Sequence, residues 1–216
     1  MGNREDLLAG AKRCLLEKGY ARTTARDIAA ASGVSLAAIG YHFGSKDALM
    51  NQAVYDSIGD WADEVERALL AAGDLTAPPL RRFESVMERT LESFSGSAHG
   101  LWASQLELMT LINQNDELRM FLAGIQKDAA GGLAGLFLNI DPEQEPETAR
   151  VTGSIYHALF IGILVKWFMD PKQALTAREL AEGLRIIAER IIADEPAPAP
   201  GPAPNPAPAD ADAGKA

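Results

Sequence analysis

Apolar side chains recur at helical spacing along most of the chain. Near the N-terminus, Leu7, Ala11, Cys14 and Leu15 share one face of a predicted helix, and Gly19 ends the run. No segment alternates apolar and polar positions with a period of two for long, and β-branched residues are not clustered. The pattern therefore predicts an all-α protein, with Cys14 as a buried thiol on an apolar face.

Capping residues and prolines mark where the later helices begin. Thr24, Ser35 and Ser45 are predicted to cap two short helices and one long helix, and Pro78 and Pro79 break the chain after them. Further helices are predicted over about residues 80–95, 100–113, 116–138, 146–169 and 176–193, with starts at Asp116, Pro146 and Thr176. Seven of the twelve prolines follow Glu195, so residues 195–216 are expected to form an extended or disordered Pro/Ala-rich tail.

The two short helices, over residues 25–31 and 36–43, are joined by the turn Ser32-Gly33-Val34, a pattern typical of a helix-turn-helix unit. Gly33 permits the positive φ that a sharp turn needs. The side chains predicted to face inward and fix the angle between the helices are Ile28, Ala29, Val34, Ile39 and Phe43.

The outer face of the second short helix would then meet base edges in a DNA major groove. Its candidate residues are Ser35, Leu36, Ala37, Ala38, Gly40, Tyr41 and His42. Thr24, Arg26 and Lys46 are candidates for phosphate contacts. Leu36, Ala37 and Ala38 offer only apolar contacts, so we expect specificity to depend on Ser35, Tyr41, His42, an N-terminal arm (Asn3, Arg4) and DNA shape.

Each polar candidate also has a plain structural interpretation. Tyr41 could be an ordinary packing residue of an amphipathic helix. His42 could form a hydrogen bond within the domain, and Lys46 could be a solvated cation at a helix start.

These residues stand in a longer pattern that is similar to one family. Its parts are Gly19-Tyr20, Thr23-Thr24-Ala-Arg-Asp-Ile-Ala, Ala31-Ser-Gly-Val-Ser and Tyr41-His42-Phe43-Gly-Ser-Lys46-Asp-Ala-Leu49. Over about its first fifty residues the chain resembles the TetR family of bacterial transcriptional regulators. Gly40 departs from the pattern, because many members carry tyrosine or another large residue there, and this puts one DNA contact in question.

The resemblance implies a DNA-binding domain over residues 1–46 and a helical sensing and dimerisation domain over 47–194, which the Pro/Ala-rich tail over 195–216 follows. It also implies a homodimer that pairs its last two helices and binds a palindromic operator on double-stranded DNA. The predicted helices 146–169 and 176–193 are apolar on several faces, which favours a partner surface over a role confined to the monomer core. Gly153 and Gly162 could permit close helix approach there.

In the family a small-molecule effector binds within the larger domain. The residues predicted to line such a cavity are Trp61, Phe83, Met87, Trp102, Gln105, Leu106, Met109, Asn113, Phe121, Ile125, Tyr156, His157, Phe160 and Trp167. Each aromatic or methionine among them could equally be plain core.

Charge and composition narrow the alternatives. The net charge is −10, yet residues 1–50 contain seven basic and five acidic residues, so a locally positive DNA-reading domain on an acidic body is possible. A single cysteine and three histidines offer no disulfide framework or metal site, no cofactor is implied, and no nucleotide-binding or metalloprotease motif indicates an enzyme. Without an apolar run of about 18 residues or a secretory leader, we expect a cytoplasmic protein with no membrane span.

The sequence favours a ligand-responsive repressor. Two alternatives stay open: an activator of the same family, and a helical interaction protein without sequence-specific DNA binding.

Overall fold

The computed structural model describes residues 2–114 and 116–194, and all regular secondary structure in these residues is helical, which confirms the all-α prediction. The α-helices are α1 (Asn3–Lys18), α2 (Ala25–Ser32), α3 (Leu36–Phe43), α4 (Lys46–Ala72), α5 (Pro79–Ser95), α6 (His99–Leu111), α7 (Asp116–Leu138), α8 (Pro146–Met169) and α9 (Ala177–Asp194). Two short 3₁₀ helices, Asp74–Thr76 and Ile112–Gln114, were not predicted. The predicted tail over 195–216 lies outside the described residues.

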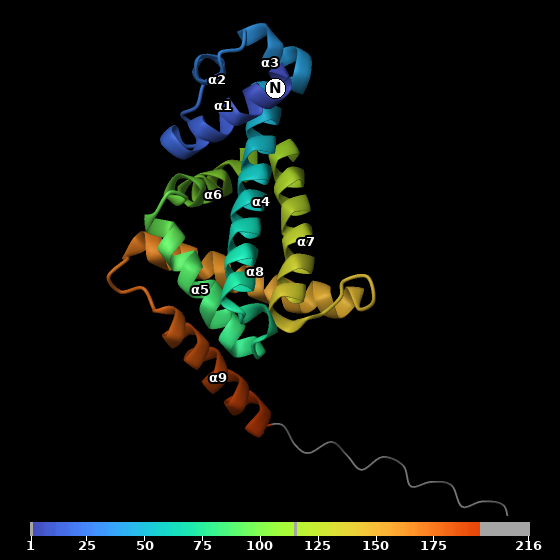
Figure 1. The fold of residues 1–216 in the computed structure, drawn as a ribbon, viewed down its shortest axis with the longest axis vertical. Coiled ribbons are helices and arrows are strands. Elements are labelled where there is room, and N and C mark those ends of the chain that lie inside the picture. Colours follow the sequence, from blue (N-terminus) through green and yellow to red (C-terminus); the bar gives the residue numbers. More distant parts are fainter. Residues whose placement is uncertain (1, 115, 195–216) are drawn as a thin grey trace, which may run out of the picture.

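The helices form a small upper unit and a larger body (Figure 1). Helices α1, α2 and α3 lie together at one end, and α4 runs from them through the length of the body. Helix α6 lies against α1, α7 lies beside α4 and packs extensively on α8, and α9 runs along α5. The upper unit is therefore joined to the body through α4 and through the contact of α6 with α1.

The predicted caps hold at two of the three early helices. The hydroxyls of Thr24 and Ser45 accept the backbone N–H groups of Asp27 and Ala48, and Gly33 takes a left-handed φ of 69° in the turn. Ser35 precedes α3 as predicted, but its side chain makes no capping hydrogen bond, so that part of the prediction is wrong. Its carbonyl instead accepts the N–H of Ala38, which closes a tight first turn.

Two buried clusters hold the molecule together. The first joins the upper unit to the body and includes Leu15, Ile28 and Leu49 with Phe94 and Leu164. The second lies lower in the body, around Phe83, Val86, Met87 and Phe137. Cys14 belongs to the first cluster, is 3% exposed, and has a thiol pKa that burial raises, so the predicted buried thiol is confirmed.

Helices α8 and α9 bury little of their apolar surface in the single chain. On α8, only Ala149, Gly153 and Leu164 are buried. Gly153 allows close contact with α7, since a Cβ there would lie 1.8 Å from the carbonyl oxygen of Ala130, whereas Gly162 has nothing within 4 Å. The exposed apolar residues of the two helices are Val151, Ile155, Met169, Ile186, Ile187, Ile191 and Ile192.

Length and composition alone make α8, within the described chain, a helix that could cross a membrane. Its mean hydropathy reaches 1.4, although polar residues such as Thr152, Ser154 and His157 interrupt the run. One such helix is weak evidence for a membrane span, because a buried core helix or a signal sequence can have the same length and hydropathy.

Candidate nucleic-acid interface and internal cavity

Helices α2 and α3 are held at a fixed angle by a small apolar core. Ile28 and Ile39 are 0% and 3% exposed, and Val34 and Phe43 pack against the same cluster. This packing leaves the opposite face of α3 in solvent, where Tyr41 is 86% exposed. The geometry matches the helix-turn-helix prediction and presents one short helix for outside contacts.

Most of the predicted DNA-contact residues lie on this surface. The exposed ones are Thr24, Arg26, Ser35, Leu36, Ala37, Gly40 and Tyr41. Ala38, His42 and Lys46 are only partly exposed, and Ala38 packs against the apolar core. The ring of Tyr41 meets that of His42 edge-on at 4.9 Å, and its high exposure argues against the interpretation of Tyr41 as a packing residue.

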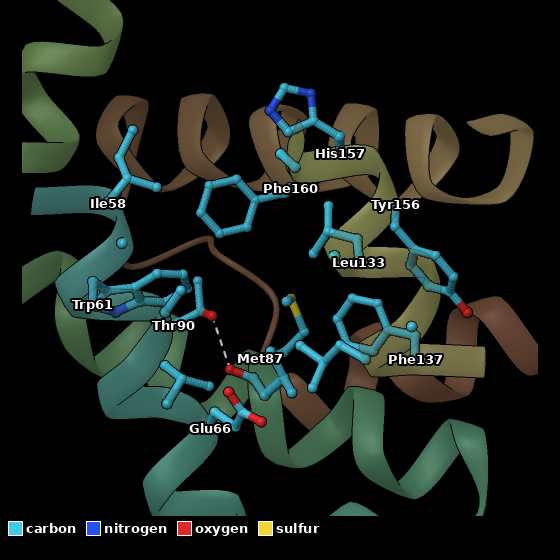
Figure 2. Close-up of a pocket in the computed structure, with 18 of the residues that line it drawn as sticks. Ile58, Trp61, Glu66, Met87, Thr90, Leu133, Phe137, Tyr156, His157 and Phe160 are labelled. Carbon is cyan, nitrogen blue, oxygen red and sulfur yellow. Dashed lines mark hydrogen bonds between the residues drawn. The ribbon is translucent and has the colours of Figure 1, made fainter. Parts of the chain in front are cut away.

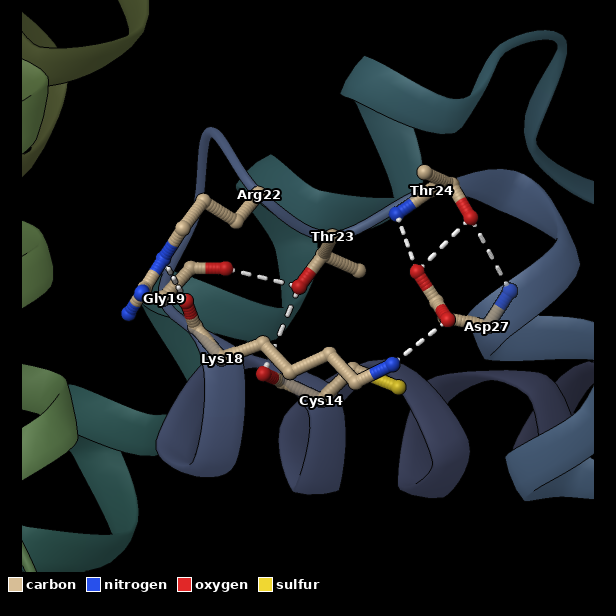
Figure 3. A network of polar contacts seen from close by, with 7 residues as sticks. All are labelled: Cys14, Lys18, Gly19, Arg22, Thr23, Thr24 and Asp27. Carbon is tan, nitrogen blue, oxygen red and sulfur yellow. Dashed lines mark hydrogen bonds and ion pairs between the residues drawn. The ribbon is translucent and has the colours of Figure 1, made fainter.

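Thr24 is already engaged within the chain (Figure 3). Its hydroxyl donates to Oδ2 of Asp27 at 2.7 Å and accepts the N–H of Asp27 at 3.2 Å. Nζ of Lys18 lies 2.5 Å from the other carboxylate oxygen of Asp27. The ion pair with Lys18 and the hydrogen bonds from Thr24 hold the pKa of Asp27 well below its usual range. The sequence interpretation predicted the Thr24 cap but missed its hydrogen bond to the Asp27 carboxylate and the ion pair of Asp27 with Lys18. These contacts leave the Thr24 hydroxyl only its acceptor capacity for an outside group.

The basic residues near α3 differ in whether their charged groups already have partners within the chain. Lys46 pairs with the carboxylate of Asp47 at 2.8 Å and lies 5.6 Å above the ring of Tyr20. Arg26 is exposed and forms no ion pair or hydrogen bond with any residue that the structure describes. Asn3 and Arg4 belong to the first turn of α1, and the guanidinium of Arg4 lies over the ring of Phe43. Of the predicted phosphate contacts Thr24, Arg26 and Lys46, Arg26 is thus the one whose polar group has no partner among the described residues.

The body contains a cavity of about 710 Å³ between α4, α5, α6, α7 and α8 (Figure 2). Trp61 of α4 and Phe160 of α8 stand on one side, and Phe137 of α7 and Tyr156 of α8 on the other. The rings of Trp61 and Trp102 meet edge-on with their centroids 4.8 Å apart, and the ring centroids of Phe137 and Tyr156 are 4.5 Å apart. This size and aromatic lining suit a small organic molecule.

The cavity brings together most, but not all, of the residues predicted for it. Those that line it are Trp61, Phe83, Met87, Trp102, Gln105, Ile125, Tyr156, His157 and Phe160. Leu106, Phe121 and Trp167 instead pack against the first apolar cluster, and Met109 lines a smaller second cavity. Asn113 is exposed in the 3₁₀ helix after α6.

The sequence interpretation missed the charged residues of the wall. Arg82 is 2% exposed, whereas Asp63, Glu66 and Asp128 are exposed. Arg81 and Arg82 both stand in the first turn of an amphipathic helix, and no local signal in the sequence distinguishes the buried arginine from the exposed one.

Two titratable groups of the wall, His157 and Tyr156, are neutral at pH 7. Burial lowers the pKa of His157 below its usual 6.5, so the ring is uncharged. Burial raises the pKa of the Tyr156 phenol, and the charge of Arg82 partly offsets that effect. In the described part of the chain, no group of three or more His, Cys, Asp or Glu side chains could hold a metal ion.

A helix-turn-helix unit on a helical body with an apolar cavity is typical of DNA-binding regulators that respond to small molecules. Residues 7–53 match the family model described as bacterial regulatory proteins, tetR family. Over this N-terminal segment the chain is similar to the TetR family.

Curated relatives cover part of the chain. It is 26% identical over 120 residues to the HTH-type transcriptional repressor DhaR of Mycobacterium sp. (strain GP1), over 55% of this chain and 59% of that protein. It is 40% identical over 65 residues to the HTH-type transcriptional regulator TtgR of Pseudomonas putida, over 30% of each. The matches thus span less than two thirds of the length of either relative.

Solved structures share the fold over most of the chain. The multidrug binding protein EbrR complexed with imidazole superposes with a TM-score of 0.62 at 22% identity, over 85% of this chain and 95% of that one. The transcriptional regulator SCO7518 from Streptomyces coelicolor A3(2) gives 0.64 at 21% identity, over 86% and 97%. The likeness supports the same arrangement of upper unit and body.

Proposed function

We propose that this chain is a transcriptional repressor that binds a palindromic DNA operator as a homodimer and is released by a small-molecule effector. The observation that carries this proposal is the exposed outer face of α3, which a buried core holds within the segment that matches the family model. Residues 1–46 would read DNA, and residues 47–194 would bind the effector and dimerise. Such a regulator acts in the cytoplasm, where the DNA is.

The chemistry of α3 favours base contacts that are few and mostly apolar. Tyr41 and His42 offer hydrogen bonds and rings, and Ser35 offers a hydroxyl at the helix start. Leu36 and Ala37 can meet thymine methyl groups, and Arg26 supplies a phosphate contact that fixes the register. The net charge of −10 makes unselective DNA binding weak, so two such units on one dimer would be needed for affinity.

The sparsely buried apolar faces of α8 and α9 support the dimer. Ile155 on α8 is 57% exposed, and Ile187 and Ile191 on α9 are 56% and 61% exposed. Several large apolar side chains exposed on the same two helices are typical of protein interfaces. A two-fold dimer through these helices would carry two copies of α3 to successive major grooves.

The effector step rests on the cavity. Structural relatives include EbrR complexed with proflavin and a regulator from Saccharomonospora viridis in complex with choline. An effector would release DNA only if it binds one arrangement of the body more tightly than the other. The named curated relatives include repressors, which favours repression over activation.

Fluorescence anisotropy with labelled DNA tests the DNA-binding step. We expect wild-type protein to bind the DNA upstream of its own gene, or a site selected from random DNA, more tightly than an unrelated duplex. Tyr41→Ala should lose that preference. Failure to prefer any selected site over random duplex would overturn the proposal in favour of an interaction protein.

A matched pair of arginine variants tests the phosphate contact. Arg26→Ala should weaken binding to all duplexes and reduce the slope of log affinity against log salt by about 1 per contact. Arg67→Ala removes an exposed arginine from α4 and should leave the salt slope unchanged.

A further inference from the structure

Arg82 is the one charged residue that the described part of the chain buries, with 2% of its surface exposed. It lies in the first turn of α5 and lines the cavity. Its guanidinium reaches Asn139, which directly follows α7, so it lies toward the end of the cavity lined by Phe137 and Tyr156. A guanidinium does not lose its proton in a protein, so this end of the cavity carries a permanent positive charge.

The positive charge has only partial compensation within the chain. Nη1 of Arg82 donates to Oδ1 of Asn139, which follows α7 with a left-handed φ of 56°. Nε of Arg82 is buried without a hydrogen-bond partner, and no carboxylate among the described residues pairs with the guanidinium. A buried charge with an unused donor is costly, so an anion that enters the cavity gains a strong partner.

A second unpartnered donor lines the same cavity. Nε2 of Gln105, on α6, is buried and has no hydrogen-bond partner. The unpartnered buried polar side-chain atoms in the described part of the wall are thus both nitrogen donors, which require acceptor oxygens on the ligand. The acidic residues Asp63, Glu66 and Asp128 are exposed, so solvent screens them more than it screens Arg82.

We propose that the effector is an apolar carboxylic acid, bound as its carboxylate to Nε and Nη2 of Arg82. The two parallel N–H groups on that edge of the guanidinium match the two oxygens of a carboxylate. The apolar body of the acid would lie against Trp61, Met87 and Phe160. A further oxygen elsewhere on the ligand would accept a hydrogen bond from Nε2 of Gln105. The inference rests on the proposed function only in taking this cavity as the effector site.

Three fluorescent probes with one apolar body test the proposal: pyrene-butanoate, pyrene-butanol and pyrene-butylamine. Energy transfer from Trp61 and Trp102 to the pyrene reports binding in the cavity. We expect wild-type protein to bind the acid at least about tenfold more tightly than the alcohol, with the amine weakest. Equal affinity for acid and alcohol, or a preference for the amine, would overturn the proposal.

Variants separate a ligand contact from a structural role. Arg82→Met should remove the preference for the acid while the alcohol still binds, which also shows that the cavity is intact. Arg82→Lys should retain part of the preference, since it keeps the charge and loses the planar fork. The control Arg81→Gln removes an exposed neighbour that pairs with Glu84, and should behave as wild type. An equal loss of all three probes in both Arg82 variants would contradict the proposal.

DNA binding is measured on the same preparations without probe. If the acid preference depends on Arg82 but no DNA sequence is preferred, the inferred ligand class stands and the proposed function fails. If selective DNA binding is present and no probe prefers Arg82, the proposed function stands and the inferred ligand class fails.

Discussion

The carboxylate of Glu107 accepts the backbone N–H groups of Tyr20 and Ala21, at 2.8 and 3.1 Å. Glu107 belongs to α6, and the two amides belong to the segment that leads from α1 into the helix-turn-helix unit. Two residues earlier on α6, Gln105 lines the cavity. Helix α6 therefore touches the cavity and holds the start of the DNA-reading unit, so a shift of α6 would move both.

Replacing Glu107 should weaken the contact between α6 and the segment that follows α1. Glu107→Ala removes a charged acceptor shared by two amides, and we expect it to lower the free energy of unfolding by about 2 kcal/mol in urea titrations. The amides of Tyr20 and Ala21 should exchange with solvent faster. The control Glu88→Ala removes an exposed carboxylate of α5 and should change neither.

The same variant tests the coupling between effector and DNA. If α6 carries the signal, a probe that releases DNA from wild-type protein should release it less from Glu107→Ala at equal cavity occupancy. Unchanged release at equal occupancy would show that the signal does not depend on the hydrogen bonds of Glu107.

The contact between α6 and α1 leaves no room for a side chain at Gly100. A Cβ there would lie 2.0 Å from the carbonyl oxygen of Leu16, so Gly100→Ala must push the two helices apart. We expect a loss of about 1–3 kcal/mol in unfolding free energy and weaker DNA binding. Gly124→Ala is the matched control, because nothing lies within 4 Å of that helical position, which belongs to α7 and not to the proposed dimer helices. It should gain up to about 1 kcal/mol from reduced chain entropy, and similar effects of the two substitutions would contradict the argument.

The helices were predictable because their signals are local. Periodicity and the caps at Thr24 and Ser45 act within a few residues, and the structure reproduces nearly the same boundaries. The cavity was predictable only in part. Leu106 and Phe121 lie on helices that border it, but helical spacing does not say which neighbour a face meets, and both pack toward the first apolar cluster.

The charged features were beyond the sequence for a different reason. Arg82 is buried by α7 and by the segment after it, which lie far from it along the chain and reach it at Asn139. The pairing of Lys18 with Asp27 likewise needs the fold to bring α1 against α2. Whether a charged side chain is buried or paired depends on segments that lie far away in the sequence. The type and spacing of neighbouring residues therefore do not predict it.

His157 should make stability depend on pH. Burial lowers its pKa in the folded state, so the unfolded chain binds the proton more readily. Stability should therefore fall as pH drops below about 6.5, and continue to fall until the folded-state pKa is passed. We expect His157→Gln to flatten the dependence of unfolding free energy on pH between about 7 and 5. The other titrating groups are common to both proteins, so superimposable curves would mean that His157 contributes nothing.

The proposed dimer predicts that one charge on α9 breaks the assembly. Ile187 is 56% exposed in the single chain, and a glutamate there would place an unpaired charge inside an apolar interface. We expect wild-type protein to sediment as a dimer and Ile187→Glu as a folded monomer, with operator affinity reduced at least about tenfold. Met120→Glu places the same charge at a similarly exposed apolar residue of α7, which is 66% exposed, and should stay dimeric. A monomeric wild-type protein at concentrations that saturate the operator would contradict the proposed dimer. Equal dissociation of both variants would also contradict the interface, because the effect of the charge would then not depend on the apolar faces of α8 and α9.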